Sequence, residues 1–238
     1  MPLNAVSRLV EARSIRKMLR ILREELIARG VTKSSYHFAP RFGSQVGPSA
    51  IIEYWRYPEG WSAGYNQPEF RANDPIPDYV MREGKILTWQ QCIAAQRLTT
   101  AQRQFVKQLI AHGLKDGVSI PLFGANGREA YVSILFDRMV GEEDRNLVRE
   151  IVIIIDATHR LVIQMLADSE EKQVEFSRRE NEVLNWMAKG KSNTDIATIL
   201  GLSPATIDTF ARRIFRKLDV GDRVTAVVRG ITNGMIRL

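Results

Sequence analysis

The last quarter of the chain has apolar residues at the spacing of helices that bury one face. Between Ser177 and Val220 they recur every three or four positions in three runs, separated by polar residues and glycines. The runs are Val183, Leu184, Trp186 and Met187, then Ile196, Ala197, Ile199 and Leu200, and finally Ile207, Phe210, Ala211, Ile214 and Leu218. This pattern predicts three short amphipathic helices around one core.

The residues between these runs are those that start and end helices. Two serines, each followed three positions later by an acid, form capping boxes, and a third serine precedes a proline suited to the first helical position. Two glycines can adopt the left-handed conformation that ends a helix. In chain order these signals are Ser177 with Glu180, Gly190, Ser192 with Asp195, Gly201, and Ser203 with Pro204.

The third predicted helix leaves a basic face to solvent. Two helices joined through a glycine turn, the second one basic, are what a helix-turn-helix needs to enter a major groove. The residues predicted to face DNA are Lys191, Ser192, Thr206, Asp208, Thr209, Arg212, Arg213 and Arg216. A plain helical bundle with a solvated arginine face is the alternative.

A fourth helix is predicted within the segment from Asp222 to Leu238, where it could brace the module or meet a second copy. Phosphate contacts dominate the affinity of a protein for DNA, and one small module makes few of them. We therefore expect the protein to bind double-stranded operator DNA as a homodimer.

The larger N-terminal part mixes helical and strand patterns. Helical spacing runs from about Ala5 to Ala28, from Thr99 to His112 and from Glu142 to Leu166, and β-rich runs are Ser35 to Ala39, Ile51 to Trp55, Val118 to Phe123 and Ala130 to Phe136. Asn126-Gly127, within the turn from Gly124 to Gly127, is typical of a hairpin, so the last two strands should be neighbours. This order predicts an α+β fold with a sheet covered on both faces.

The polar segment 167–176 has no apolar stripe and is the predicted linker. It divides the chain into an N-terminal domain of residues 1–166 and a DNA-binding domain of residues 177–238. The predicted helix before the linker has more apolar residues than one core face needs. Val148, Val152 and Ile163 form a second stripe, which we interpret as a dimer seam.

The segment from Tyr57 to Trp89 is rich in aromatic residues and prolines. Most of its aromatic side chains have a hydroxyl or an indole N–H, and Asp74 is followed by a proline that restrains its backbone. Such side chains near a carboxylate suit a closed pocket for a small amphiphilic ligand. The residues alone equally allow a loop-rich core in which Asp74 opens a turn.

The amino-acid composition limits the cellular compartment and the classes of partner that we expect. The net charge of +7 and a pI near 9.7 favour a polyanionic partner. Cys92 is the only cysteine, which excludes an intrachain disulfide framework and a multi-thiolate zinc site. The strongest apolar run, Ile151 to Ile155, is too short to span a bilayer, and the segment from Met1 to Arg29 has a folded helical pattern. We expect a cytoplasmic protein with no membrane contact, metal or cofactor.

Ten positions spread over both parts of the chain share a recognisable spacing. They are Tyr57, Trp61, Tyr65, Asp74, Pro75, Trp89 and Gly117, followed by Glu180, Leu184 and Gly190. In this spacing the chain resembles the LuxR-type quorum-sensing transcription regulators over nearly its whole length. The resemblance implies an autoinducer-binding domain with an antiparallel sheet between helices, an N-acyl-homoserine lactone as ligand, and a four-helix LuxR-type helix-turn-helix domain. It also implies RNA polymerase as a partner if the protein is an activator.

The resemblance gives each residue of the predicted ligand site a role. Trp61 would donate its indole N–H to the lactone carbonyl, Tyr57 would donate to the acyl carbonyl, and Asp74 would accept the amide N–H. Each buried polar group of the ligand needs such a partner, because an unmatched one costs about 1 to 3 kcal/mol. Tyr65 and Trp89 would line the ligand, and Ser133 occupies a strand position where relatives often place a hydroxyl.

Two residues of the third predicted helix depart from the family pattern. Asp208 stands where relatives often have a basic or amide residue, and Phe210 stands where histidine is frequent. Phe210 can pack in the core. Asp208 could accept from a cytosine amino group or repel phosphate, so the operator sequence stays open.

Two other functions compete with this reading of the chain. The run from Gly60 to Gly64 matches the G-x-S-x-G pattern of nucleophilic serines, but prolines on both sides disfavour the strand–turn–helix that the pattern requires. We therefore expect no enzymatic activity. The N-terminal domain could instead sense a different small molecule or only mediate protein contacts.

Overall fold

The computed structural model describes residues 2–38, 51–65, 67–124, 128–169, 175–232 and 234–236. The chain divides into two units, one that comprises residues 1–124 and 128–168 and one that includes residues 169–238. Within the described ranges, no helix has both the length and the apolar character required to cross a membrane.

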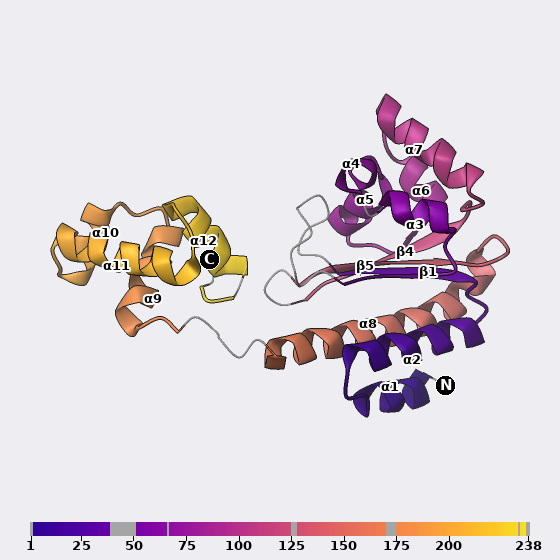
Figure 1. Cartoon of the computed structure of the whole chain (residues 1–238), viewed down its shortest axis with the longest axis horizontal. Helices are drawn as coiled ribbons and strands as arrows, with labels where there is room; N and C mark the ends of the chain where they lie inside the picture. Colours follow the sequence, from indigo (N-terminus) through magenta and orange to yellow (C-terminus); the bar gives the residue numbers. More distant parts are fainter. Residues whose placement is uncertain are drawn as a thin grey trace. The chain divides into compact units, whose positions relative to one another are not determined.

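An antiparallel sheet of five strands is the frame of the N-terminal unit. Its strands lie in the order β2 (Ile51–Trp55), β1 (Lys33–Phe38), β5 (Ala130–Leu135), β4 (Gly117–Leu122) and β3 (Leu87–Thr88). Helices cover both faces, as Figure 1 shows. The predicted α+β fold is therefore confirmed. β4 and β5 are neighbours as expected, whereas the predicted turn at 125–127 lies outside the described residues.

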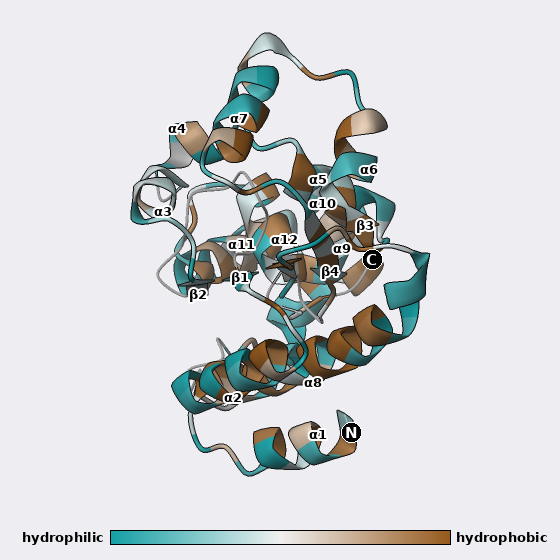
Figure 2. Ribbon diagram, turned by 90° about the vertical axis from the view of Figure 1, so that its right-hand side faces the viewer, coloured by the Kyte–Doolittle hydropathy of each residue, from teal (hydrophilic) through white to brown (hydrophobic). Residues whose placement is uncertain are grey.

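Three helices lie on one side of the sheet, where the second and third lie against its face and the first packs on the outer side of the second. They are α1 (Pro2–Val10), α2 (Ile15–Ala28) and α8 (Arg145–Ser169), and hydrophobic residues recur along α2 and α8 between polar ones (Figure 2). The prediction of one continuous helix from Ala5 to Ala28 is wrong. The Ser14 hydroxyl accepts a hydrogen bond from the Lys17 amide and so starts a separate helix.

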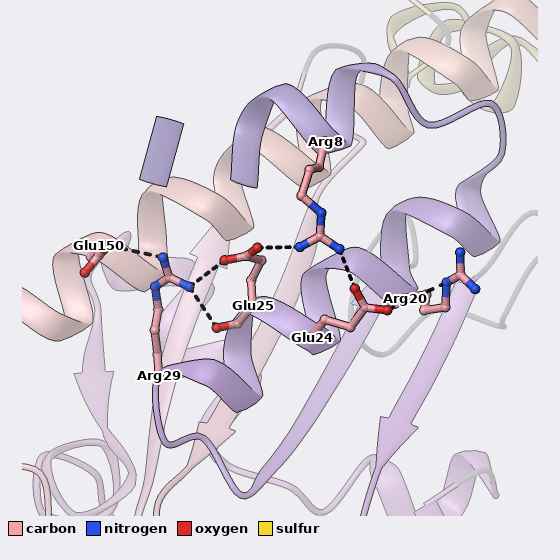
Figure 3. Close-up of polar contacts among 6 residues, drawn as sticks. All are labelled: Arg8, Arg20, Glu24, Glu25, Arg29 and Glu150. Carbon is pink, nitrogen blue, oxygen red and sulfur yellow. Dashed lines mark hydrogen bonds and ion pairs between the residues drawn. The ribbon is translucent and has the colours of Figure 1, made fainter. Parts of the chain in front are cut away.

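Ion pairs hold these three helices together at their ends. Arg8 of α1 contacts Glu24 and Glu25 of α2 at 2.5 and 2.7 Å, which folds α1 back along α2. Arg29, which follows α2, pairs with Glu25 at 2.6 Å and with Glu150 of α8 at 3.1 Å (Figure 3). The charged side chains at the helix ends are thereby paired, while the apolar sides of the helices are buried in the core on this side of the sheet.

Helix α8 is longer than the sequence indicated. A short 3-10 turn, η2 (Glu142–Asp144), precedes it, and the helix continues to Ser169, three residues into the predicted linker. Neither glycine nor proline interrupts that stretch, so nothing in its chemistry ends the helix earlier. The stripe formed by Val148, Val152 and Ile163 is half-buried and packs against the core of this unit, so only part of it is left for a second copy.

Five short helices cover the other face of the sheet. They are α3 (Glu59–Tyr65), α4 (Pro68–Arg71), α5 (Ile76–Glu83), α6 (Trp89–Ala94) and α7 (Thr100–Ala111). The segment between Tyr57 and Trp89 is mostly helical, which differs from the loop-rich core that its residues also allowed. Its prolines begin helices instead of breaking them, because Pro68 is the first residue of α4, and Pro75 and Pro77 lie at the start of α5.

The C-terminal unit has four helices, as predicted. They are α9 (Arg178–Ala188), α10 (Asn193–Leu200), α11 (Pro204–Leu218) and α12 (Arg223–Thr232). Both predicted capping boxes form, and Gly190 and Gly201 have the expected positive φ angles of 73° and 65°. The apolar faces meet in one core around Leu184, Ile196 and Ile207.

Candidate ligand-binding and DNA-binding sites

A row of small polar side chains, which we call the serine row, crosses the centre of the sheet on its α3–α7 face. Antiparallel register places Ser35 of β1 opposite Ser133 of β5, and Ser133 opposite Ser119 of β4. Tyr54 of β2 and Leu87 of β3 continue the same row at its two ends. The central serines are buried, and their short side chains allow large side chains or a ligand to lie over them.

The predicted aromatic residues pack together above this row. Trp61 and Tyr65 of α3 and Trp89 of α6 are each at most 4% exposed and belong to one apolar cluster, against which the half-buried Tyr57 also packs. The Trp89 indole lies directly on Gly117, where a Cβ atom would come within 2.3 Å of the ring. The structure therefore brings the predicted ligand-site residues to one face of the sheet.

Asp74 is the acidic group of this cluster. Its Oδ2 accepts from the Tyr65 hydroxyl at 2.8 Å, and its Oδ1 accepts from the Ile76 amide at 2.9 Å, which opens the turn into α5. Burial raises the pKa of Asp74 to about 7, although both hydrogen bonds oppose the shift. A carboxylate has about four acceptor positions, so two remain for another N–H donor.

Three buried polar atoms around the row have no hydrogen-bond partner among the residues that the structure describes. They are the Tyr54 hydroxyl, Trp89 Nε1 and Ser133 Oγ. Ser133 Oγ does not reach hydrogen-bond geometry with any described residue. Burial raises the pKa of Tyr57 to about 12, and the nearby Ser133 hydroxyl acts in the opposite direction by lowering that pKa. Each unsatisfied group costs about 1 to 3 kcal/mol, which a ligand with matching polar groups would recover.

Three residues of this face were missed from the sequence. Tyr54, His37 and Tyr131 form a ring cluster, with the His37 ring 5.2 Å from that of Tyr54 and 5.9 Å from that of Tyr131. Burial lowers the pKa of His37 to about 3, so it is neutral at physiological pH. Strand alternation would have found Tyr131, since it lies two residues before Ser133 and so shares its face.

A groove of about 230 Å³ lies between α2 and strands β1 and β2. Its lining includes Ser34 and Tyr36, which alternate along β1 with the residues of the serine row and so point to the opposite face of the sheet. The groove therefore lies mainly on the opposite face from the predicted ligand site, and it shares Tyr54, on the edge strand β2, with that site.

The G-x-S-x-G run does not have the geometry of a nucleophile. It lies inside α3, and Ser62 donates its hydroxyl proton to the Pro58 carbonyl at 3.3 Å. Burial raises the pKa of the Cys92 thiol to about 12, which keeps it protonated.

The predicted DNA-binding residues gather on one face of the C-terminal unit. Thr206 is half-buried near the start of α11, while Asp208, Thr209, Arg212, Arg213 and Arg216 are exposed along it, and Lys191 and Ser192 are exposed where α10 begins. Lys217, on the same helix, is engaged within the unit, because it contacts the Glu180 carboxylate at 2.7 Å. Arg212, Arg213 and Arg216 thus remain as the cations that α11 offers to phosphate or base edges.

Comparisons with known proteins match one family model to each of the two units of the chain. Residues 14–162 match the family model of the autoinducer binding domain, and residues 174–229 match that of the bacterial regulatory proteins of the luxR family. The transcriptional activator protein AhyR of Aeromonas hydrophila is 26% identical over 222 residues, which cover 89% of this chain and 85% of AhyR. The regulatory protein SdiA of Escherichia coli is 27% identical over 219 residues, which cover 89% of this chain and 88% of SdiA.

Solved structures share the fold. SdiA in complex with octanoyl-rac-glycerol superposes with a TM-score of 0.73 at 19% identity, over 100% of this chain and 96% of SdiA. CepR2 from Burkholderia cenocepacia, an N-acylhomoserine lactone dependent LuxR family transcription factor, gives a TM-score of 0.56 at 17% identity, over 70% of this chain and 96% of CepR2. The chain therefore belongs to the LuxR family of quorum-sensing transcription regulators, with an N-terminal autoinducer-binding domain and a C-terminal helix-turn-helix domain.

Proposed function

We propose that this regulator binds an N-acyl-homoserine lactone over the serine row of its N-terminal unit and, as a cytoplasmic homodimer, binds operator DNA through α11. The proposal is supported by a set of buried polar groups on the α3–α7 face of the sheet. It consists of the Asp74 carboxylate and of the Tyr54, Trp89 and Ser133 groups, which find no hydrogen-bond partner among the described residues.

The polar groups of such a lactone complement this set. The molecule has one amide N–H, which needs an acceptor, and two carbonyl oxygens, which need donors. Asp74 supplies an acceptor, and the hydroxyl and indole N–H groups above the sheet supply donors. The aromatic rings of Trp61 and Tyr65 supply apolar contact for the ring and chain of the ligand.

Exposed apolar side chains support the proposed dimer. Val224 and Val228 lie one turn apart on α12 and are 71% and 44% exposed, and Ile153 on α8 is 54% exposed. Covering such side chains on association is favourable. Two copies of α11 would then reach two half-sites of a palindromic operator, and RNA polymerase would be a further partner if the protein activates transcription.

We propose that the protein binds its ligand without turnover and without a cofactor. Neither Ser62 in its helix nor the protonated Cys92 thiol has the activation that a nucleophile needs. A second candidate follows from the relative SdiA, whose complex contains an acyl glycerol. Such a ligand has no amide N–H, so Asp74 would accept from a hydroxyl instead.

The test is to identify what the protein retains. Full-length protein is expressed with and without a panel of acyl lactones and with octanoyl glycerol. Bound small molecules are then extracted and identified by mass spectrometry. One lactone retained at one copy per chain is the expected result. Retention of the acyl glycerol alone would favour the second candidate, and retention of nothing would favour a domain that only mediates protein contacts.

A further inference from the structure

Asp208 is the only acidic residue of α11, on the face that carries Arg212, Arg213 and Arg216. In the part of the chain that the structure describes, no cation lies within ion-pair distance of it. An exposed carboxylate that approaches DNA meets the repulsion of the phosphates. Its place on this face therefore calls for a compensating contact in the complex.

A hydrogen-bonded chain fixes the direction of the Asp208 side chain. Asn193, the first residue of α10, donates from Nδ2 to Asp208 Oδ1 at 2.5 Å. The Asn193 Oδ1 accepts in turn from Arg223 of α12 at 3.2 Å. Arg223 also donates to the carbonyls of Met187 and Lys191, at the end of α9 and in the turn before α10. The chain thus ties Asp208 to all three other helices of the unit.

One oxygen of Asp208 is left over by this arrangement. Oδ1 is engaged by the Asn193 amide, whereas Oδ2 makes no hydrogen bond to any residue that the structure describes. The oxygen that remains needs an N–H or O–H donor, and a phosphate of DNA offers none.

In the major groove, the donors are the amino groups of cytosine and adenine. Adenine presents its N6 amino group beside the N7 lone pair, which repels a carboxylate, whereas cytosine presents N4 alone. Asp208 is the fifth residue of α11, within the part of a recognition helix that reaches base edges. From these observations, we infer that Asp208 is a specificity-determining residue that accepts a hydrogen bond from the N4 amino group of a cytosine in each operator half-site.

This inference rests on the proposed function, because it requires sequence-specific DNA binding. The experiment selects bound sequences from randomised duplex DNA with the full-length protein, purified from cells grown with and without the lactone panel. The variants are Asp208→Asn, Asp208→Ala and Asn193→Ala. Asp219→Asn is the matched control, since Asp219 is exposed, ends α11 in a left-handed conformation and makes no side-chain contact to α10 in the described residues.

The expected parent sequence has one position per half-site with about 5- to 150-fold preference for cytosine. Asp208→Asn should move that preference to adenine, because an amide pairs with both N6 and N7 of adenine. Asp208→Ala should abolish the preference while the other positions keep theirs. Asn193→Ala should weaken it without a change of base, and Asp219→Asn should reproduce the parent sequence.

Other outcomes separate the possible failures. If Asp208→Asn and Asp208→Ala select the parent sequence, or weaken binding to all sequences equally, Asp208 only positions the helices and the inference is overturned. If neither the parent nor the Asp219→Asn control enriches any sequence in either growth condition, sequence-specific DNA binding itself is refuted, and the inference falls with the proposed function.

Discussion

Replacement of Asp74 by asparagine removes a charge from the centre of the proposed ligand site with little change of shape. The carboxylate accepts from Tyr65 and from the Ile76 amide, and its two other acceptor positions are available to the ligand amide. A hydrogen bond to a charged acceptor contributes about 1.5 to 3 kcal/mol, so Asp74→Asn should weaken lactone binding by about ten- to a hundredfold.

The raised pKa of Asp74, about 7, adds a signature in pH. The ligand N–H requires the ionised carboxylate, so lactone affinity should fall by up to about tenfold for each pH unit below 7 and level off above about pH 8. Stability should change in the opposite sense. Because the folded-state pKa lies above the unfolded value, the contribution of Asp74 is fully present below about pH 4 and is lost as the pH rises through 7.

Calorimetric titration of lactone against the purified protein, between about pH 5.5 and 7.5, measures the affinity lost in Asp74→Asn and the pH dependence of lactone affinity in the parent. Glu69→Gln is the matched control, because Glu69 lies on the same segment but is exposed. The variant Asp74→Asn should bind weakly and without pH dependence, whereas the control should follow the parent. Equal affinities of Asp74→Asn and the parent at about pH 7.5 would refute the role of this carboxylate.

Three further predictions address packing, DNA contact and the stability of the C-terminal unit. Gly117→Ala would place a methyl group 2.3 Å from the indole packed on it, so lactone binding should be lost, whereas Gly60→Ala, which meets open space, should bind normally in the same titration. Arg212→Ala should weaken operator binding by about 1 to 3 kcal/mol at matched salt and leave lactone binding and melting temperature unchanged. Burial disfavours ionisation of Glu180, but hydrogen bonds from Lys217 and Ser177 outweigh it and lower the pKa. The C-terminal unit should therefore lose stability as the pH falls below about 4, and by a smaller amount in Lys217→Met, as followed by circular dichroism.

The helix-turn-helix was predictable because each of its helices begins and ends at signals formed by neighbouring residues. The Ser177 and Ser192 capping boxes and the Gly201 turn form as the sequence indicated, since they depend on contacts within four residues. The same local chemistry was misread near the N-terminus. Ser14 starts α2, but its signal is hidden in a run of apolar residues that also fits one longer helix.

The ligand site was predictable only in part. Trp61, Tyr65 and Asp74 lie close in sequence, and the resemblance to a family located them. Tyr54 and His37 lie on strands β2 and β1, and their place in the site is set by the register of β1 against β2 and β5. Register depends on pairings between distant segments, which the pattern of one strand does not contain.

We propose that a lactone bound in the N-terminal unit controls DNA binding by the C-terminal unit. The most direct test is the operator affinity of the full-length protein, measured across lactone concentrations at fixed salt. We expect operator affinity to change, in either direction, with a midpoint that matches lactone binding. Operator DNA should change lactone affinity by the same factor. Lactone that binds at one copy per chain but leaves operator affinity unchanged at every concentration would contradict this proposal.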